Sequence, residues 1–345
     1  MGTFRAAVIG LGSMGKNHAR HYFEMEDVEL VAIADPDWNS LSWFSRRYPA
    51  RTYTDHREMI EREQPDLISV TVPTWLHRPV ALDVIEAGIH LIVEKPIALY
   101  EDEALEIIER AEARGVKLTV GHVERFNPVV RKMKEEIERN RLGKIFKIQA
   151  RRQSPYPIRI QDVGVVIDLA PHDIDIMRFL LNDRIDRLYA EIQRNFRTDR
   201  EDVLACFLRF SSGVLGQLEV DWITPTTVRE LRIVGEKGMF VANYLTQELY
   251  FFENGEMSGE WDGSRQFVAI SEGEMHKYRI QRKEPLRLEL EDFVDAIRNN
   301  RPPLVEGEDG FQALCLARAI LESGLKGTIV HPDRLIPEND FQAMN

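Results

Sequence analysis

The first 35 residues constrain the fold of this chain more than any other segment. A strand-like segment at residues 5–9 leads into Gly10-Leu11-Gly12-Ser13-Met14-Gly15, and a helix-like segment, a second strand-like segment at residues 28–34 and Asp35 follow. This order of strand, glycine-rich turn, helix, strand and acidic residue is typical of a unit that binds a dinucleotide. Glycine-rich turns are common, so the prediction depends on the order of the elements.

Each residue of the motif has an expected role. Gly10 permits the tight turn, Gly12 lets a pyrophosphate approach the backbone, and Gly15 lets the helix pack closely on the strand. The amides that open the helix then hold the phosphates. Asp35 is expected to accept hydrogen bonds from the adenosine ribose and to repel a 2′-phosphate, so NAD is favoured over NADP. Asp35 also suits a turn in Asp35-Pro36-Asp37, and both roles are compatible.

Composition indicates an ordinary intracellular enzyme. The chain has 345 residues, which favours two domains, predicted at residues 1–122 and 123–345. Its net charge of −12 argues against a nucleic acid partner. Cys206 and Cys315 lie far apart in apolar stretches, which is typical of core thiols in a reducing compartment. There is no signal-peptide pattern and no apolar run long enough to span a membrane, so we expect a soluble, cytoplasmic protein.

The hydrophobic pattern predicts a different architecture for each half. Up to about residue 122, strands and helices alternate, which predicts an α/β Rossmann domain with a doubly wound parallel sheet. The second half is predicted to be α+β, with an open, largely antiparallel sheet. Its helices are expected at 129–139, 166–181, 286–298 and 311–323, and its strands at 145–152, 187–194, 203–210, 214–221, 228–234, 239–244 and 248–252.

Polar residues follow three further strands of the first half. Pro73-Thr74 precede His77, Glu94-Lys95-Pro96 follow an apolar strand directly, and Gly121-His122 follow the last strand. Ligands of open α/β sheets bind beyond the carboxyl ends of the strands, which favours a functional role. For Glu94-Lys95 a solvated loop pair is the alternative.

The second half contains Asp168 and His172, four residues apart. On a helix they share one face, although Pro171 suits a helix that starts near it, with Asp168 at its N-terminus. A carboxylate beside a histidine can orient it and tune it as a general base. A capping or core-facing histidine is the alternative.

Together these motifs resemble the Gfo/Idh/MocA family of NAD(P)-dependent oxidoreductases, over nearly the whole chain. The resemblance implies that Lys95 binds the reacting oxygen and that His172 takes the hydroxyl proton. It also implies that Asp168 orients His172 or holds a substrate hydroxyl, and that Glu94 lies near the nicotinamide ribose. The expected activity is NAD-dependent oxidation of a CH–OH group, with no metal.

A finer resemblance is to the branch that includes UDP-N-acetylglucosamine 3-dehydrogenases and related uronic-acid 3-dehydrogenases. It rests on residues 121–128 and on the segment with Arg151, Arg152, Tyr156 and Arg159. The arginines suit a diphosphate and Tyr156 suits a base or ring, but arginines alternating on a strand serve a solvated or subunit-contact face equally well.

The expected site therefore has three sets of residues. The catalytic set is Lys95, Asp168 and His172. The cofactor set is Gly10, Gly12, Ser13, Met14, Gly15, Asp35, Thr71, Pro73, Thr74, His77, Glu94 and Lys95. The substrate set is His122, Glu124, Arg125, Asn127, Arg152, Tyr156 and Arg159.

Three other functions remain open. These are a free-sugar or inositol dehydrogenase, a non-catalytic NAD-binding regulator, and a relative that uses retained NAD in glycoside cleavage. Retention of Lys95, Asp168 and His172 speaks against the regulator. The resemblance also implies a homo-oligomer, a dimer or tetramer, formed through the second sheet.

Overall fold

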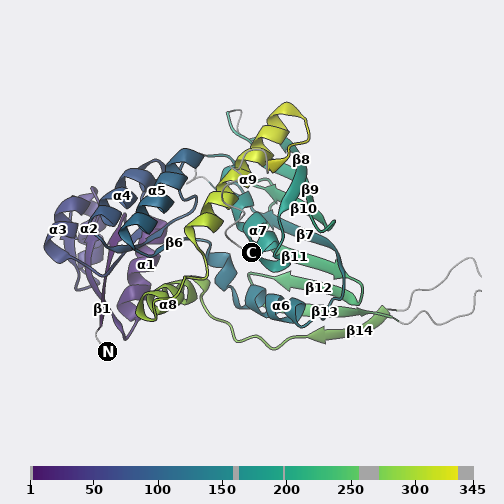
Figure 1. Ribbon diagram of the computed structural model, residues 1–345, viewed down its shortest axis with the longest axis horizontal. Helices are drawn as coiled ribbons and strands as arrows, with labels where there is room; N and C mark the ends of the chain where they lie inside the picture. The colour runs from purple at the N-terminus through teal and green to yellow at the C-terminus, as the bar shows by residue number, and fades with distance from the viewer. Residues whose placement is uncertain (1–2, 158–162, 197–198, 256–271, 333–345) are drawn as a thin grey trace, which may run out of the picture. The chain divides into compact units, whose positions relative to one another are not determined.

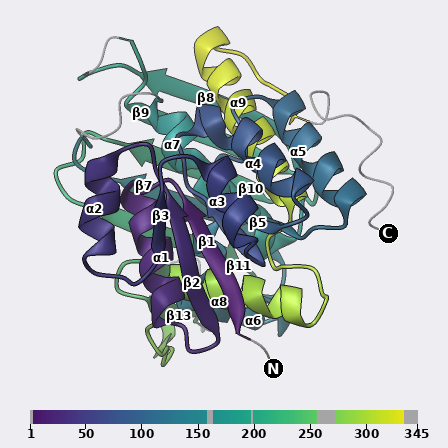
Figure 2. The same cartoon turned by 90° about the vertical axis from the view of Figure 1, so that its left-hand side faces the viewer.

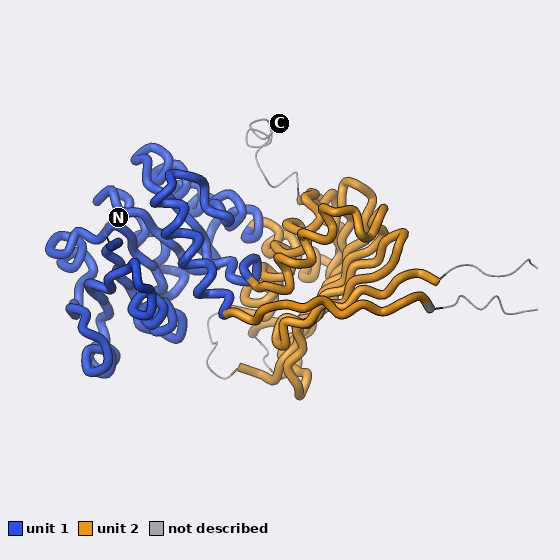
Figure 3. Tube along the Cα trace, turned by 90° about the horizontal axis from the view of Figure 1, so that it is seen from below, with its two compact units in different colours: residues 1–126, 284–314 blue, residues 127–283, 315–345 orange. Residues whose placement is uncertain are grey.

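The chain forms two compact units, each made of two segments. Unit 1 comprises Met1–Phe126 and Glu284–Leu314, and unit 2 comprises Asn127–Lys283 and Cys315–Asn345 (Figure 3). The computed structural model describes residues 3–157, 163–196, 199–255 and 272–332. Figure 1 labels the helices and strands named below. Residues 284–314, which the sequence placed in the second half, belong to unit 1.

Unit 1 is built on a six-stranded parallel sheet in the order β3-β2-β1-β4-β5-β6 (Figure 2). This is the Rossmann order, in which the direction of progression reverses between β1 and β4 and ligands bind at the carboxyl ends there. The strands are β1 (Phe4–Ile9), β2 (Val28–Ala34), β3 (Arg51–Tyr53), β4 (Leu67–Val70), β5 (His90–Val93) and β6 (Leu118–Val120).

Helices connect these strands and complete the core of unit 1. They are α1 (Ser13–Glu24), α2 (Trp38–Ser45), α3 (His56–Glu63), η1 (Thr74–Leu76), α4 (His77–Glu86), α5 (Glu101–Arg114), η2 (Val123–Phe126) and α8 (Pro285–Arg298). Asp37 and Asp55 cap α2 and α3, as short polar side chains do at helix starts. Leu290 and Phe293 of α8 are buried in one core cluster with Val8 and Ile33, which explains why this late helix belongs to unit 1.

Unit 2 contains an eight-stranded sheet in the order β14-β13-β12-β11-β7-β10-β9-β8 (Figure 1). β7 and β10 pair in parallel and the remaining neighbours pair antiparallel. The strands are β7 (Ile145–Gln153), β8 (Ile185–Gln193), β9 (Val203–Phe210), β10 (Leu215–Asp221), β11 (Val228–Gly235), β12 (Gly238–Asn243), β13 (Glu248–Asn254) and β14 (Glu272–Lys277).

Only one face of the unit 2 sheet is covered. Along β9, Cys206 and Leu208 are buried whereas Ala205 and Phe207 are exposed, the alternation of a sheet with one solvated face. The buried face packs on α6 (Pro128–Glu138), α7 (Val165–Leu181) and the part of α9 (Gly307–Lys326) that belongs to unit 2. The other face lacks such a cover among the described residues.

The predicted fold class is confirmed for both halves, and most predicted elements lie within two residues of the observed ones. The strand β14 was not predicted, because its charged sequence lacks alternation and it pairs only with β13 at the sheet edge. The helix α7 runs through Pro171 instead of starting near it. Its buried packing compensates for the helical hydrogen bond that proline removes. Among the described residues, no helix has the length and apolarity needed to cross a membrane.

Candidate cofactor and active-site residues

The glycine-rich turn after β1 has the geometry expected of a nucleotide-binding loop. Gly10 has φ +96°, and a Cβ there would lie 2.7 Å from the carbonyl oxygen of Thr71. A Cβ on Gly15 would overlap the carbonyl oxygen of Gly10, so α1 packs too closely for any side chain. A Cβ on Gly12 would meet no atom within 4 Å, which leaves the turn open on that side. The turn at Gly10 and the close packing at Gly15 are as predicted from the sequence, and the approach of a pyrophosphate at Gly12 stays a prediction.

The start of α1 suits a phosphate group. The helix begins at Ser13, directly after Gly12, and Gly12 offers no side-chain cap. The first turn, which includes Met14, contains no acidic residue. Uncapped amides at a helix start attract anions through their N–H groups and the helix dipole. The residues present therefore fit the pyrophosphate of a dinucleotide, with the amides of Ser13 and Met14 as donors.

Asp35, at the end of β2, is linked to the glycine-rich turn. Its Oδ2 accepts a hydrogen bond from the amide of Leu11 at 2.5 Å, and its Oδ1 accepts from the amide of Asp37 at 2.8 Å. Asp37 caps α2 through the amides of Asn39 and Ser40, and the Ser40 hydroxyl, as its main partner, lowers the pKa of Asp37. Two carboxylates thus lie where a 2′-phosphate would need cations, as the predicted preference for NAD requires.

Thr71 supports the same turn from β4. Its hydroxyl donates to the carbonyl oxygens of Gly10 and Ile9, at 2.7 and 3.0 Å. Pro73 and Thr74 continue this loop, with Thr74 opening η1. The structure therefore places all three residues at the carboxyl end of β4, where the cofactor role was predicted.

His77 connects the loops that follow β4 and β5. It is buried, with Nδ1 2.8 Å from the carbonyl oxygen of Pro96 and Nε2 2.9 Å from that of Val72. Burial lowers the pKa of His77, against the opposing effect of the two carbonyls. The neutral ring has one N–H and donates to one carbonyl at a time. This arrangement gives His77 a structural role in the loops, and its predicted contact with the cofactor stays a prediction.

Glu94 and Lys95 lie at the carboxyl end of β5. The Glu94 carboxylate is buried, 3.1 Å from Nε2 of His18 on α1, and its Oε2 accepts from the amide of Lys95 at 3.2 Å. Burial raises the pKa of Glu94, but the hydrogen bond and charge of His18 and the charge of Lys95 outweigh it, so the net shift is downward. A Cβ on Gly121 would lie 2.9 Å from Oε2, so the glycine provides room for the carboxylate.

Three residues after β6 were predicted to contact the substrate. His122 is buried and Glu124 is half-buried. Arg125 is also buried and forms a bidentate pair with Asp309, at 2.7 and 2.9 Å. That pair gives Arg125 a structural role, and the substrate role predicted for these three residues stays a prediction.

In unit 2, Asp168 and His172 lie on α7. They are four residues apart in a continuous helix and therefore share a face, and both are half-buried. The start of α7 is fixed by Glu201, whose carboxylate accepts from the amide of Val166 at 3.2 Å and whose carbonyl accepts from that of Val165 at 3.0 Å. Asp168 and His172 therefore lie on one helix face as expected, and their catalytic roles stay a prediction.

Arg152 belongs to a buried ion pair. Its Nε lies 2.5 Å from Oδ2 of Asp173, and both side chains are at most 4% exposed. Arg151 points to the opposite face of β7, where it pairs with Glu219 at 3.3 Å. The two arginines therefore do not form one cationic rim, because consecutive residues of a strand face opposite ways.

The remaining substrate residues lie in two places. Tyr156 packs edge-on against Trp222 and Phe196, with ring centroids 6.0 and 6.2 Å apart. Asn127 is buried, caps α6 and donates to the carbonyl oxygen of Tyr244 at 3.3 Å. Arg159 lies outside the described residues.

Three residues that support the site were missed from the sequence: His18, Asp173 and Glu201. His18 follows Gly15 by three positions, so it shares the face of α1 that Gly15 packs against the sheet; this spacing was the available signal. Asp173 and Glu201 bond to groups 21 and 35 positions away in sequence, and no local sequence pattern predicts such contacts.

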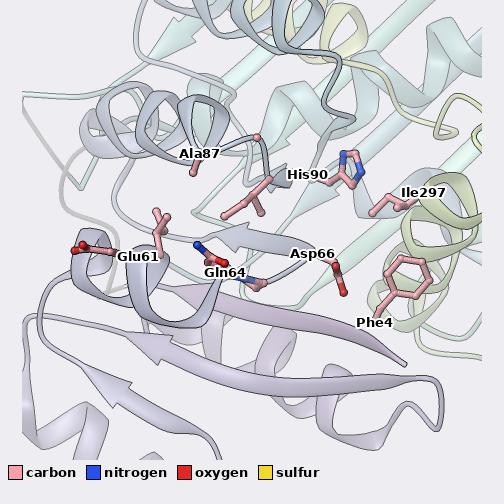
Figure 4. A pocket seen from close by; sticks show the side chains of 11 residues that line it. Phe4, Glu61, Gln64, Asp66, Ala87, His90 and Ile297 are labelled. Atoms are coloured by element: carbon pink, nitrogen blue, oxygen red, sulfur yellow. The ribbon is translucent and has the colours of Figure 1, made fainter. Parts of the chain in front are cut away.

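A cavity of about 590 Å³ lies at the amino ends of the strands of the unit 1 sheet (Figure 4). Phe4, Asp66 and His90, which line it, stand at the amino ends of β1, β4 and β5, and Gln64 and Ile297 complete the wall. Ligands of doubly wound sheets bind at the carboxyl ends, so this cavity is not the nucleotide site.

Comparison with known families supports this assignment of the two halves. Residues 4–122 match the oxidoreductase family with an NAD-binding Rossmann fold, and residues 130–241 match the GFO/IDH/MocA C-terminal domain. Myo-inositol 2-dehydrogenase of Thermotoga maritima is 28% identical over 92% of this chain and 96% of its own length.

Two solved structures share the fold over nearly their whole length. UDP-N-acetylglucosamine 3-dehydrogenase GnnA from Acidithiobacillus ferrooxidans has a TM-score of 0.83 at 24% identity, covering 94% of this chain and 98% of its own. The WlbA dehydrogenase from Bordetella pertussis, solved with NADH and UDP-GlcNAcA, has a TM-score of 0.78 at 22% identity, covering 97% and 99%.

The Rossmann sheet, the open glycine turn and the matched NAD-binding domain define an NAD-dependent oxidoreductase. The chain belongs to the Gfo/Idh/MocA family, with both of that family's domains in order.

Proposed function

We propose that this oxidoreductase oxidises a ring CH–OH group of a sugar or cyclitol to a ketone. Bound NAD supplies the acceptor for the hydride. The protein must then withdraw the hydroxyl proton and stabilise charge on the oxygen, which requires one base and one cation. The chain offers Lys95 as the cation and His172, beside Asp168, as the base.

The roles divide between the two units. Lys95 donates a hydrogen bond to the reacting oxygen, and His172 accepts its proton as the hydride leaves the carbon. Asp168 orients the ring of His172 or holds a neighbouring hydroxyl. The support is that Lys95 follows the buried Glu94 at a strand end, while Asp168 and His172 share a helix face.

The finer proposal is oxidation at C3 of a UDP-N-acetylhexosamine or its uronic acid. The observation that carries it is likeness over 91% of this chain and 95% of the relative to UDP-N-acetylglucosamine 3-dehydrogenase of A. ferrooxidans, at 24% identity. In the described part of unit 2, Tyr156 adds an aromatic face beside Trp222. Arg159 supplies the positive charge for a diphosphate in this proposal.

Oxidation of an inositol or a free sugar is the second candidate. It is favoured by the likeness to myo-inositol 2-dehydrogenase of T. maritima at 28% identity and by the pairing of Arg152 with Asp173. That pairing neutralises one of the cations that a nucleotide diphosphate would use.

A substrate panel distinguishes the two candidates. UDP-sugars, free sugars and inositols are each incubated with the enzyme and NAD, and NADH is followed by absorbance. NADH formation with UDP-sugars alone, with a raised KM in Arg159→Ala, supports the nucleotide-sugar proposal. Turnover of myo-inositol or glucose with none of UDP-sugars supports the second candidate.

Self-association through the open face of the unit 2 sheet is also proposed. Exposed apolar side chains on this face include Phe207 at 51%, Phe252 at 39% and Met275 at 56%. Burying such side chains against a second copy removes apolar surface from water. Light scattering after gel filtration should give the mass of a dimer or tetramer, and Phe207→Glu should lower the fraction of this oligomer. A monomeric native protein overturns the proposal.

A cytoplasmic location is proposed from the two cysteines. Cys206 and Cys315 are buried free thiols, and burial raises the pKa of Cys206 to about 12. Such thiols are unreactive core residues and suit a reducing compartment. Thiol titration should find both cysteines unreactive in the folded protein and reactive, as free thiols, after unfolding.

A further inference from the structure

A buried chain of hydrogen bonds runs behind Glu94 in unit 1. Nε2 of His18 lies 3.1 Å from Oε1 of Glu94, and Nδ1 of His18 lies 3.0 Å from Oγ of Ser69. The hydroxyl of Tyr22 then lies 2.7 Å from the same Oγ. His18, Ser69 and Tyr22 are 0% exposed and Glu94 is 8% exposed, so water does not compete for these bonds. The chain links α1, β4 and the end of β5.

The hydrogen bond between His18 and Glu94 has a determined direction. The Glu94 carboxylate, whose pKa is lowered overall, can only accept, so Nε2 of His18 donates to it. The other ring nitrogen, Nδ1, bonds to the hydroxyl of Ser69, which also bonds to the hydroxyl of Tyr22. Burial raises the pKa of Tyr22, which keeps its proton. Contacts at both ring nitrogens thus hold the His18 ring with Nε2 directed at Glu94.

A second carboxyl, Glu289 on α8, faces the same region. Burial raises its pKa well above the ordinary value, with the Glu94 and Asp292 charges acting in the same direction. Glu289 therefore holds its proton more tightly than Glu94 does, and Glu94 is the carboxylate that His18 contacts. The hydrogen bond from His18 keeps that charge on Glu94 in a buried setting where burial alone would neutralise it.

We propose that His18 is a positioning residue that holds Glu94 ionised and in one orientation at the carboxyl end of β5. His18 reaches one oxygen of Glu94, and the amide of Lys95 reaches the other. The lone pairs of the carboxylate that these two donors leave unused would bind the nicotinamide ribose, and the backbone of Lys95 is tied to the same carboxylate. This inference rests on the proposed function only in assigning Glu94 and Lys95 to the cofactor end of the site; the role of His18 is exerted through Glu94.

Two conservative variants separate positioning from packing. In His18→Gln the amide nitrogen reaches the place of Nε2 and retains the bond to Glu94. In His18→Asn the amide reaches only the place of Nδ1, so it retains the bond to Ser69 and leaves Glu94 without its donor. Ser69→Ala and Tyr22→Phe remove the outer links and should act in the same direction more weakly.

The readouts are the dissociation constant of NADH, from its fluorescence, and kcat and KM for NAD. We expect His18→Asn to weaken NADH binding or lower kcat about tenfold, and His18→Gln to stay within about threefold of the native protein. In a Glu94→Gln background, His18→Asn should have little further effect, since the partner it orients is gone.

Equal losses in His18→Asn and His18→Gln, or additive losses with Glu94→Gln, would show a packing role and overturn the proposal. Native NADH affinity and native turnover in Glu94→Gln would overturn the cofactor role of Glu94. Because NADH binding needs no substrate, these results stand whichever substrate the panel identifies.

Discussion

The two units hold their polar residues in different ways. In unit 1, Asp35, Thr71 and Glu94 stand at the ends of neighbouring parallel strands and bond mainly to backbone groups and to α1. In unit 2, Arg152 on β7 and Asp173 on α7 form a buried ion pair, and Glu201 fixes the start of that helix. In unit 1 the polar residues thus share the carboxyl edge of one parallel sheet, whereas in unit 2 they hold a helix to a strand and to the loop before β9.

Two buried acids, one in each unit, differ in whether they have a partner. Asp173 in unit 2 is ionised against Arg152, whereas neither oxygen of Glu289 in unit 1 has a hydrogen-bond partner among the described residues. A buried carboxyl with a cation is stabilised as an anion, and one without a partner is stabilised as the neutral acid. Replacing the two acids by their neutral amides should therefore have opposite effects on stability.

The largest effect is expected from breaking the unit 2 pair. Arg152→Met removes the cation that pairs with the buried Asp173, which should cost about 3–5 kcal/mol of unfolding free energy. Denaturant unfolding measures this loss. The matched control is Arg152→Met with Asp173→Leu, which removes both charges and should be more stable than the single variant. Equal stability of the two would show that the pair is not responsible.

Variants of Lys95 and His172 test the catalytic roles that we propose for these two residues. Lys95→Ala and His172→Ala should each lower kcat by about 10²-fold or more, since general-base and oxyanion contacts have this magnitude. NADH affinity should change little in His172→Ala. Lys117→Ala, a lysine at the amino end of β6, serves as the control and should keep native kinetics. Near-native turnover in either catalytic variant contradicts its role.

Asp35 tests whether the strand edge of unit 1 also sets cofactor choice. Asp35→Ser removes the charge that opposes a 2′-phosphate and should narrow the ratio of the NADP and NAD dissociation constants by about tenfold. Asp37→Ser, which keeps a helix cap on α2, should change the ratio less. NADP binding as tight as NAD in the native protein would contradict the assignment.

The smallest effect is expected from Glu289→Gln. Because the folded state binds the Glu289 proton more tightly than the unfolded chain, stability contributed by this group falls as the pH rises above the ordinary value of 4.5. Glu289→Gln should abolish that fall and raise the melting temperature more at pH 8 than at pH 5. Asp173→Asn should lower the melting temperature at both. A lower melting temperature for Glu289→Gln at pH 8 would contradict the neutral state of Glu289.

The residues of the two units also differ in how well they could be predicted from the sequence. Gly10, Gly12, Gly15 and Asp35 were placed from sequence because one βαβ unit contains them all, and local spacing fixes their geometry. The ion pair of Arg152 could not be predicted in this way, because its partner Asp173 lies 21 residues away on another element. The alternation of a strand predicts which face of the sheet a side chain lies on. It does not predict which charged residue of the packed helix contacts that side chain.

The sequence by itself determined the Rossmann unit, the open, largely antiparallel sheet and the dinucleotide loop. These follow from hydrophobic periodicity and from steric demands on a few glycines, which act over short stretches of chain. Only the tertiary structure decided that residues 284–314 belong to unit 1, that Arg152 pairs with Asp173, and that His18 stands behind Glu94. Such contacts join segments far apart in sequence, and packing determines which buried polar groups meet.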